Sequence, residues 1–251
     1  MRSRLDVEMA RRGLAESREA AQRLIMAGHV RVNSRPAAKS DLKVDAGSEI
    51  AVVGGPRRYA SRGAYKLLAA LDHFALHIEG RHALDVGASN GGFTDVLLER
   101  GAAHVIALDV GYGQLADRLR RDPRVTVRDR TNIRLVEPAA LPYRPDLVVI
   151  DASFISLRVV LPATIALIVA SADIIALVKP QFEVGKAKVG KGGVVRDDAM
   201  RLRALEGVIA FAATLGLKTA GTMESPIAGA AGNREFLAWL RYRGANADNR
   251  F

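Results

Sequence analysis

A glycine-containing turn between two acidic residues is the part of this sequence best suited to bind a small molecule. An apolar, strand-like run ends at Asp85, and a helical pattern begins a few residues later. Bare glycine backbone lets a ligand come close to strand ends. A second strand-like run ends at Asp109, 24 positions after Asp85, where a carboxylate can accept hydrogen bonds from both hydroxyls of a ribose. The pair predicts a ligand of the adenosine type.

The spacing of these glycines favours S-adenosylmethionine over a dinucleotide. The pattern is G-x-x-x-G-G, not the G-x-G-x-x-G that brings backbone against a pyrophosphate. S-adenosylmethionine has no phosphate and carries a sulfonium cation, which an acidic residue suits. Asp129, after a third strand-like run, is a candidate to bind the adenine amino group, although turn capping is an equal alternative. The residues expected to bind the cofactor are Asp85, Gly87, Ala88, Ser89, Gly91, Gly92, Phe93, Asp109 and Asp129.

Charge and cysteine content narrow the classes of partner and reaction. The 251 residues contain 37 Lys and Arg against 27 Asp and Glu, for a net charge of +10. Such a surface favours polyanions, with nucleic acid first among them. The chain has no cysteine, which excludes disulfides, zinc sites built on thiolates and a Cys nucleophile. We predict no metal site, because His73 and His77 have helical spacing but lack a third ligand.

The chain is expected to have two domains separated by a short linker. Glycine, proline and arginine interrupt the apolar pattern over residues 54–63. We place a small basic domain at 1–58, a linker at 59–63, a large domain at 64–243 and a frayed tail at 244–251. Residues 1–58 hold twelve basic and seven acidic side chains, and their pattern predicts two helices followed by short strands.

The small domain resembles the alpha-L RNA-binding domain first described in a ribosomal small-subunit protein. The similarity lies in Arg4-Leu5-Asp6, Ser17-Arg18, Gly28 and the Val30–Asn33 run, and it spans nearly the whole segment. An exposed basic face there would bind a phosphate backbone, with an ordinary solvated surface as the alternative. The predicted RNA-binding residues, including some outside this domain, are Arg4, Arg11, Arg12, Arg18, Arg23, Arg57, Arg58, Arg62, Lys186 and Lys188.

The large domain is predicted to be an α/β fold: a Rossmann-like parallel sheet with helices on both faces. Apolar runs alternate with helical patterns throughout it. Two final strands near 218–224 and 235–242 are expected to complete the sheet, with the last one antiparallel. The predicted earlier strands are 82–86, 105–110, 125–127, 147–151 and 174–179.

Eight ordered sequence blocks in the large domain resemble the TlyA, or hemolysin-A-like, family. They include SRGAYKL at 61–67, DVGASNGGFTDVLL at 85–98, DASFISL at 151–157, KPQFEVGK at 179–186 and GNREFLAWL at 232–240. Members of that family resemble the FtsJ group of ribose 2'-O-methyltransferases and methylate cytidine ribose in ribosomal RNA. The short chain ends resemble the subtype associated with large-subunit RNA alone.

The resemblance implies a catalytic tetrad made of Lys66, Asp151, Lys179 and Glu235. A ribose hydroxyl is a weak nucleophile at neutral pH, so transfer needs proton removal and in-line placement. We assign proton removal to Lys179 and orientation to the carboxylates. Sequence leaves open which carboxylate pairs with which lysine. Ala228 and Ala230 stand where family members usually have proline, which makes Glu235 the tetrad assignment most in need of a structural test.

The leading hypothesis is therefore an enzyme, an S-adenosylmethionine-dependent ribosomal RNA (cytidine-2'-O-)-methyltransferase. One alternative is a non-catalytic RNA-binding or ribosome-assembly protein that retains the cofactor fold. Another is a membrane-active hemolysin, which only the family name suggests. No signal peptide or membrane span is predicted, so we expect a cytoplasmic protein that binds ribosomal RNA or a ribosomal subunit.

Overall fold

The computed structural model divides the chain into two compact units, Met1–Arg58 and Tyr59–Phe251. It describes residues 3–15, 17–26, 28–45, 47–53, 59–185, 189–190 and 192–244. The predicted frayed tail lies outside these residues apart from Gly244. Among the described residues, no helix has the length and apolar character needed to cross a membrane.

The smaller unit packs two helices against short strands around its own core. Its elements are β1 (Ser3–Arg4), α1 (Leu5–Arg11), α2 (Arg18–Met26), β2 (Val30–Val32), β3 (Arg35–Pro36), β4 (Lys43–Val44) and β5 (Ile50–Val52). Ala21 and Ile25, one helical turn apart, are buried against Leu5 and Met9 of α1. The prediction of two helices followed by strands omits β1, which pairs antiparallel with β4 across 39 residues of sequence separation and which no local pattern reveals.

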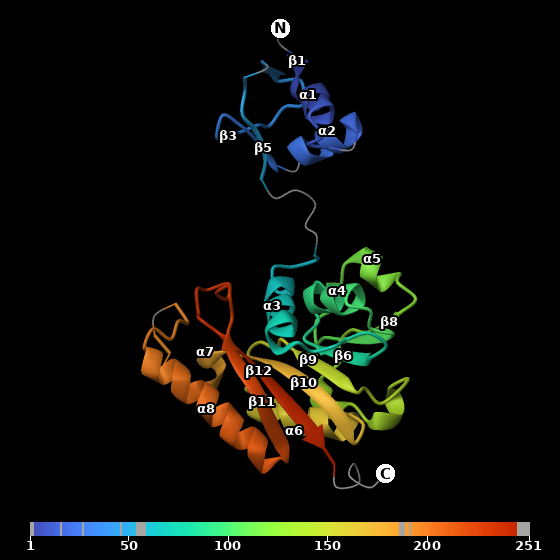
Figure 1. Cartoon of the computed structure of the whole chain (residues 1–251), viewed down its shortest axis with the longest axis vertical. Coiled ribbons are helices and arrows are strands. Elements are labelled where there is room, and N and C mark those ends of the chain that lie inside the picture. The colour runs from blue at the N-terminus through green and yellow to red at the C-terminus, as the bar shows by residue number, and fades with distance from the viewer. Residues whose placement is uncertain are drawn as a thin grey trace. The chain divides into compact units, whose positions relative to one another are not determined.

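The larger unit is built on a seven-stranded sheet with the order β11-β12-β10-β9-β6-β7-β8 (Figure 1). The strands are β6 (His82–Val86), β7 (His104–Leu108), β8 (Val125–Arg128), β9 (Leu147–Ile150), β10 (Ser171–Val178), β11 (Leu217–Glu224) and β12 (Phe236–Arg243). The helices are α3 (Ala64–Phe74), α4 (Gly92–Glu99), α5 (Asp117–Arg120), α6 (Leu157–Leu167), α7 (Pro180–Glu183) and α8 (Asp198–Thr214), with short 3-10 turns at Ile133–Leu135 and Pro138–Ala140.

Helices cover both faces of this sheet because its strands are apolar on both sides. Alternate residues of each strand pack in opposite directions. Leu84 and Ile150 belong to the core beneath α6 and α8, whereas Ala83 and Val149 belong to the core beneath α3 and α4. This arrangement confirms the predicted Rossmann-like fold, and Figure 1 shows α3 and α4 on the side of the sheet away from α6.

The order of the strands reverses between β6 and β9. From β6 the chain runs outward through β7 and β8 and then returns to place β9 on the other side of β6. Ligands of open α/β sheets bind at such a reversal, beyond the carboxyl ends of the strands. Both final strands are antiparallel to their neighbours, β12 to β10 and β11 to β12.

The segment predicted as a linker, 59–63, belongs structurally to the larger unit. Tyr59 is buried and its hydroxyl donates to Glu99 at 3.1 Å, while the Ala60 amide donates to Asp95 at 2.6 Å. These contacts attach the segment to α4. The glycine and proline residues that suggested a longer linker precede Tyr59, so the boundary falls between 58 and 59.

Candidate active site

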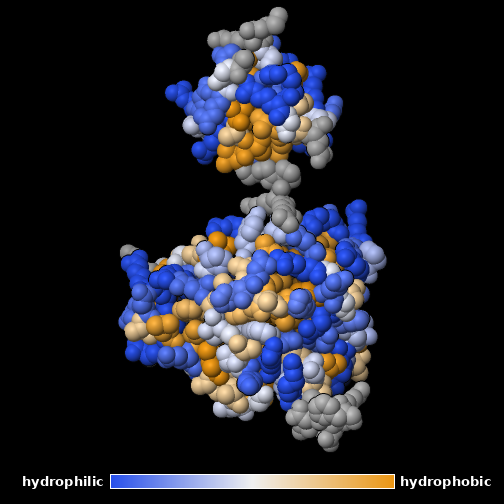
Figure 2. Space-filling model, viewed as in Figure 1, coloured by the Kyte–Doolittle hydropathy of each residue, from blue (hydrophilic) through white to orange (hydrophobic). Residues whose placement is uncertain are grey.

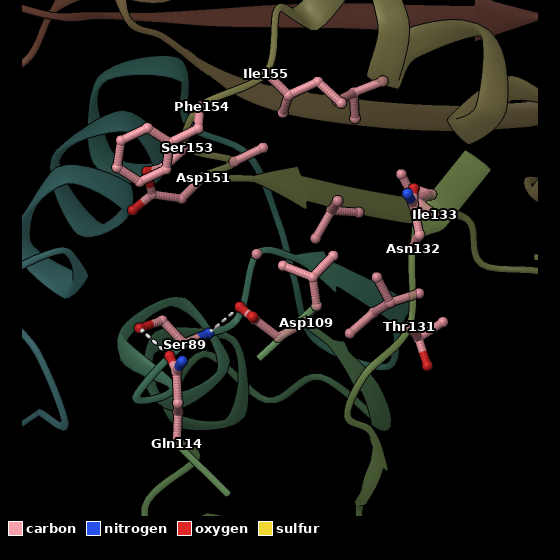
Figure 3. A pocket seen from close by; sticks show the side chains of 16 residues that line it. Ser89, Asp109, Gln114, Thr131, Asn132, Ile133, Asp151, Ser153, Phe154 and Ile155 are labelled. Atoms are coloured by element: carbon pink, nitrogen blue, oxygen red, sulfur yellow. Dashed lines mark hydrogen bonds between the residues drawn. The ribbon is translucent and has the colours of Figure 1, made fainter. Parts of the chain in front are cut away.

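A cavity of about 420 Å³ opens at the strand-order reversal. It is lined at the strand ends by Gly87 after β6, Asp109 after β7 and Asp151 after β9. Its volume lies in the range typical of small-molecule sites. Figure 3 shows Asp109 and Ser89 on one wall and Asp151 with Phe154 on another.

Asp109 is held in place by backbone amides. Its Oδ2 accepts from the Ser89 amide at 2.8 Å (Figure 3), and its Oδ1 accepts from the Gly111 amide at 2.7 Å. An ionised carboxylate has about four acceptor positions. Two therefore remain for hydroxyl donors from the cavity, as the predicted contact with a ribose requires.

Asp85 is fully buried and only partly satisfied. Thr94 Oγ1 donates to Oδ2 at 2.7 Å, and Oδ1 has no hydrogen-bond partner among the described residues. Burial raises the pKa of Asp85 to about 7, the Thr94 hydrogen bond opposes that rise, and the negative charges of Asp151 and Asp109 add to it. This excess of carboxylates beside the cavity suits a cationic ligand.

Of the nine predicted cofactor residues, Gly87, Ser89 and Asp109 line the cavity. Gly87, at φ 83°, lies so close to the next strand that an added Cβ would be 2.8 Å from the Asp151 carbonyl oxygen. Gly91 and Gly92 are closely packed, because a Cβ there would meet Leu119 or Ser61. The predicted residues that are not part of the cavity wall are Asp85, Ala88, Gly91, Gly92, Phe93 and Asp129.

Asp129 has partners that explain its position without an adenine. Its Oδ2 accepts from the Arg120 guanidinium at 2.9 Å and from the Gly113 amide at 3.1 Å. These bonds lower the pKa of Asp129 against the opposing effect of burial. Thr131 and Asn132, two and three residues later, form the cavity wall there.

The four tetrad residues form two ion pairs. Lys66 Nζ donates to Glu235 Oε2 at 2.6 Å, and both side chains are almost fully buried. Lys179 Nζ lies 2.7 Å from Asp151 Oδ1 and donates to Ser153 Oγ at 2.8 Å. The pairing that sequence left open is thus Lys66 with Glu235 and Lys179 with Asp151.

Strand register explains why residues so far apart in sequence meet. Val178 is paired with Phe236 across β10 and β12, so the next residues in the two antiparallel strands, Lys179 and Glu235, share that end of the sheet. Asp151 directly follows β9, the parallel neighbour of β10. Lys66 approaches from α3, whose first turn follows Gly63, and a Cβ on Gly63 would be 3.5 Å from Asp151 Oδ2.

The turn before β12 fits closely around Glu235. A Cβ on Gly229 would be 2.4 Å from Glu235 Oε1, so only glycine leaves room for the carboxylate. The buried Asn233 ties this turn to the preceding loop: its Oδ1 accepts from the Val195 amide and its Nδ2 donates to the Gly193 carbonyl, each at 2.9 Å. The structure thus holds Glu235 without the prolines that Ala228 and Ala230 replace.

Sequence reasoning missed several cavity residues. Phe154 is 93% exposed at φ 63°, and its ring lies 5.4 Å from that of Phe182. Ser153 contacts Lys179, as described above. Both belong to the DASFISL block, which drew attention only to its aspartate. The other missed polar residues of the wall are Gln114, Thr131 and Asn132.

The predicted RNA-binding residues are distributed over both units. Arg23 and Arg62 are exposed, while Arg4, Arg11, Arg12 and Arg18 contact acidic side chains of α1. The positions of Arg57, Arg58, Lys186 and Lys188 lie outside the described residues.

The cavity is suited to S-adenosylmethionine. Asp109 retains acceptor positions for a ribose, and the wall carboxylates Asp109 and Asp151 favour a sulfonium. No cluster of cations is present among the wall residues to hold a pyrophosphate. Asp151, at the far wall, links the cavity to the tetrad.

Comparisons with known proteins agree with this geometry. Residues 59–242 match the model of the FtsJ-like methyltransferases, and residues 3–50 match that of the S4 domain. The chain is 53% identical to the 16S/23S rRNA (cytidine-2'-O)-methyltransferase TlyA of Mycobacterium tuberculosis, over 96% of this chain and 90% of that protein. It is 38% identical to the 23S rRNA (cytidine-2'-O)-methyltransferase TlyA of Campylobacter jejuni, over 78% and 73%.

A solved structure, that of a candidate hemolysin from Streptococcus thermophilus, matches with a TM-score of 0.74 and 42% identity and covers 98% of this chain and 92% of that one. Both family models and these relatives cover most of the chain. The chain therefore belongs to the TlyA family of FtsJ-like, S-adenosylmethionine-dependent methyltransferases that carry an N-terminal S4 domain.

Proposed function

We propose that this protein transfers the methyl group of S-adenosylmethionine to the 2'-hydroxyl of a cytidine in ribosomal RNA. The observation that carries the proposal is a lysine–carboxylate pair, Lys179 with Asp151, whose carboxylate lines the cavity suited to the cofactor. The second pair, Lys66 with Glu235, lies at the same end of the sheet and supports it. The relatives from Mycobacterium tuberculosis and Campylobacter jejuni are both named as 23S rRNA (cytidine-2'-O)-methyltransferases, so we propose the large-subunit RNA as substrate and the cytoplasm as the place of reaction.

When bound, the cofactor supplies an electrophilic methyl group on a sulfonium. The protein's part is to place the hydroxyl in line with that methyl group and to accept its proton. Asp151 borders the cavity and pairs with Lys179, so we assign proton acceptance to Lys179, oriented by Asp151 and Ser153. Lys179 must first release one proton of its ammonium group to solvent, and it then takes up the proton of the hydroxyl. Lys66 and Glu235 form a buried ion pair at the same end of the sheet, and we assign this pair to the orientation of the hydroxyl.

Phe154 has the properties of a support for the target base. A side chain this exposed gains little from its position in the free protein, and stacking on a base would cover it. Base–aromatic stacking contributes about 1–3 kcal/mol. We include Phe154 in the proposed site as the residue that holds the cytosine while its ribose reacts.

Purified protein with labelled cofactor and unmodified large-subunit RNA is expected to yield 2'-O-methylcytidine after nuclease digestion and mass spectrometry. Lys179→Met keeps the length of the side chain and removes the amine, and it should lower the transfer rate by about 10²–10⁴-fold. Cofactor and RNA affinities should stay close to wild type. A base-methylated product would reject the proposal, and so would full activity of Lys179→Met.

A further inference from the structure

Two carboxylates of α1 are buried beneath arginines of the smaller unit. Asp6 is fully buried and Glu8 is 4% exposed. A buried carboxylate is tolerated only when it is paired and hydrogen-bonded. Each of these two carboxylates contacts two of the arginines predicted to bind RNA.

Asp6 joins arginines that come from two different elements. Arg4, in β1, donates from Nε to Oδ1 at 3.0 Å and from Nη2 to Oδ2 at 3.1 Å. Arg18, in α2, donates from Nε to Oδ2 at 3.0 Å, and Gln22 donates to the same oxygen at 2.7 Å. The Arg4 hydrogen bonds, with smaller contributions from Gln22 and Arg18, hold the pKa of Asp6 well below its usual range.

Glu8 is surrounded in a similar way on its own part of α1. Arg11 donates from Nε to Oε2 at 2.9 Å and from Nη2 to Oε1 at 2.6 Å, and Ser3 donates to Oε2 at 3.0 Å. Arg12 donates to Oε1 at 2.7 Å and also to the Ser48 carbonyl at 2.8 Å.

The contacts of Arg4, Arg11 and Arg18 use only part of each guanidinium and leave further N–H donors. A guanidinium has five N–H donors in a rigid plane. The Arg4 and Arg18 side chains are 35% and 52% exposed, and Arg11 is 65% exposed. Each carboxylate therefore fixes a cation whose remaining donors face solvent. Figure 2 shows largely hydrophilic surface on the smaller unit, interrupted by an apolar area.

We propose that Asp6 is a positioning residue for RNA binding, which fixes Arg4 and Arg18 so that their outward donors meet phosphate groups. Glu8 does the same for Arg11. This inference rests on the proposed function, because it takes ribosomal RNA as the partner. Two charges in a fixed arrangement bind adjacent phosphates without first losing side-chain freedom. The negative charges of Asp6 and Glu8 slightly weaken the long-range attraction between the smaller unit and RNA. The fixed positions that they give to the arginines contribute more to RNA affinity than this loss removes.

The sign of one measurement separates this idea from simple electrostatics. Asp6→Asn raises the net charge by one, so charge alone predicts tighter binding to RNA. Positioning predicts weaker binding, by about tenfold at physiological salt, since one or two phosphate contacts are displaced. The matched control is Glu49→Gln, which changes the charge equally at an exposed side chain with no described arginine contact and should bind RNA at least as well as wild type.

The experiment measures the affinity of the full-length protein for an unmodified large-subunit RNA fragment over a range of salt concentrations. A double-mutant cycle with Arg18→Gln then tests the mechanism. If Asp6 acts through Arg18, the fold loss of RNA affinity in the double variant should be much smaller than the product of the fold losses in the two single variants. Equal or tighter binding by Asp6→Asn, or strictly multiplicative effects, would overturn the inference.

Thermal unfolding and cofactor affinity show whether each variant is folded. If Asp6→Asn does not fold, Glu8→Gln decides the question by the same sign test, because it also adds one positive charge and releases Arg11. Failure of the proposed function has a different signature. In that case the wild-type chain neither binds nor methylates ribosomal RNA, whereas failure of the inference leaves both properties intact.

Discussion

At the residue scale, the site combines groups that are unfavourable to bury with groups that compensate for them. Lys66 and Glu235 neutralise each other at 2.6 Å, and Lys179 is neutralised by Asp151. Breaking such a buried pair leaves an uncompensated charge. Asp85 differs, because burial raises its pKa and the single hydrogen bond from Thr94 opposes that rise only in part.

The raised pKa of Asp85 predicts a pH-dependent stability. Its pKa is about 7 in the folded state and about 3.9 when unfolded, so the folded state holds the proton more tightly. Stability from this group is complete below about pH 4 and is lost as the pH rises to about 7. Asp85→Asn should therefore become more stable relative to wild type between pH 5 and pH 8, as measured by thermal unfolding without cofactor. The exposed Glu79→Gln serves as control, and a difference that stays flat with pH would contradict the prediction.

The exposure of Phe154 predicts a selective effect on the RNA reaction. Phe154→Ala should lower kcat/KM for RNA by about 5- to 150-fold, which corresponds to about 1–3 kcal/mol of stacking. Phe154→Trp should retain most of the activity, since it keeps an aromatic surface. Steady-state kinetics with unmodified RNA measures this effect. Equal activity of the Ala and Trp variants would show that stacking is not the function of this side chain.

At the element scale, the active site depends on loops that fix strand ends. The turn before β12 contacts the Glu235 carboxylate through Gly229 and the loop at 193–195 through Asn233. Because Gly229 and Asn233 fix the backbone of this turn, a substitution at either position is expected to move Glu235 and, with it, its partner Lys66.

Gly229→Ala is expected to reduce the transfer rate by about tenfold or more, because the new methyl group would collide with Glu235 Oε1. Ala230→Ser, an exposed position in the same turn, is the matched control and should be close to wild type. Cofactor affinity, measured by calorimetry, should be unchanged in both. A loss of cofactor binding in Gly229→Ala would instead indicate a wider disturbance of the sheet.

At the scale of the whole molecule, the two units carry separate tasks. Residues 1–58 contribute +5 of the net charge of +10, and each unit has its own buried core. The larger unit contains the cavity and the tetrad. RNA affinity and methyl transfer are thus expected to be separable.

A chain that begins at Tyr59 should keep its cofactor affinity and lose most of its RNA affinity. The cut leaves Tyr59 with its contact to Glu99, so the larger unit retains its core. The salt dependence of RNA binding should become shallower, since fewer phosphate contacts remain. Binding measured at several salt concentrations tests this expectation, and unchanged RNA affinity would contradict it.

The sequence by itself determined the fold class and most strands, and it predicted the tetrad. Alternating and continuous apolar runs specify strands locally, and β6 begins and ends where the pattern predicts. Family resemblance named Lys66, Asp151, Lys179 and Glu235, since short motifs preserve the residue types that chemistry requires.

Tertiary structure alone decided how these residues pair and which of the predicted ones reach the cavity. The Lys66–Glu235 contact spans 169 positions and depends on strand register and on the placement of α3, which no local pattern encodes. For the same reason the sequence did not reveal that Gly91 and Gly92 lie outside the cavity wall, and it did not reveal β1 or the position of Phe154. Local sequence sets the conformation of each segment, whereas burial and register, which arise from the folded whole, set its contacts.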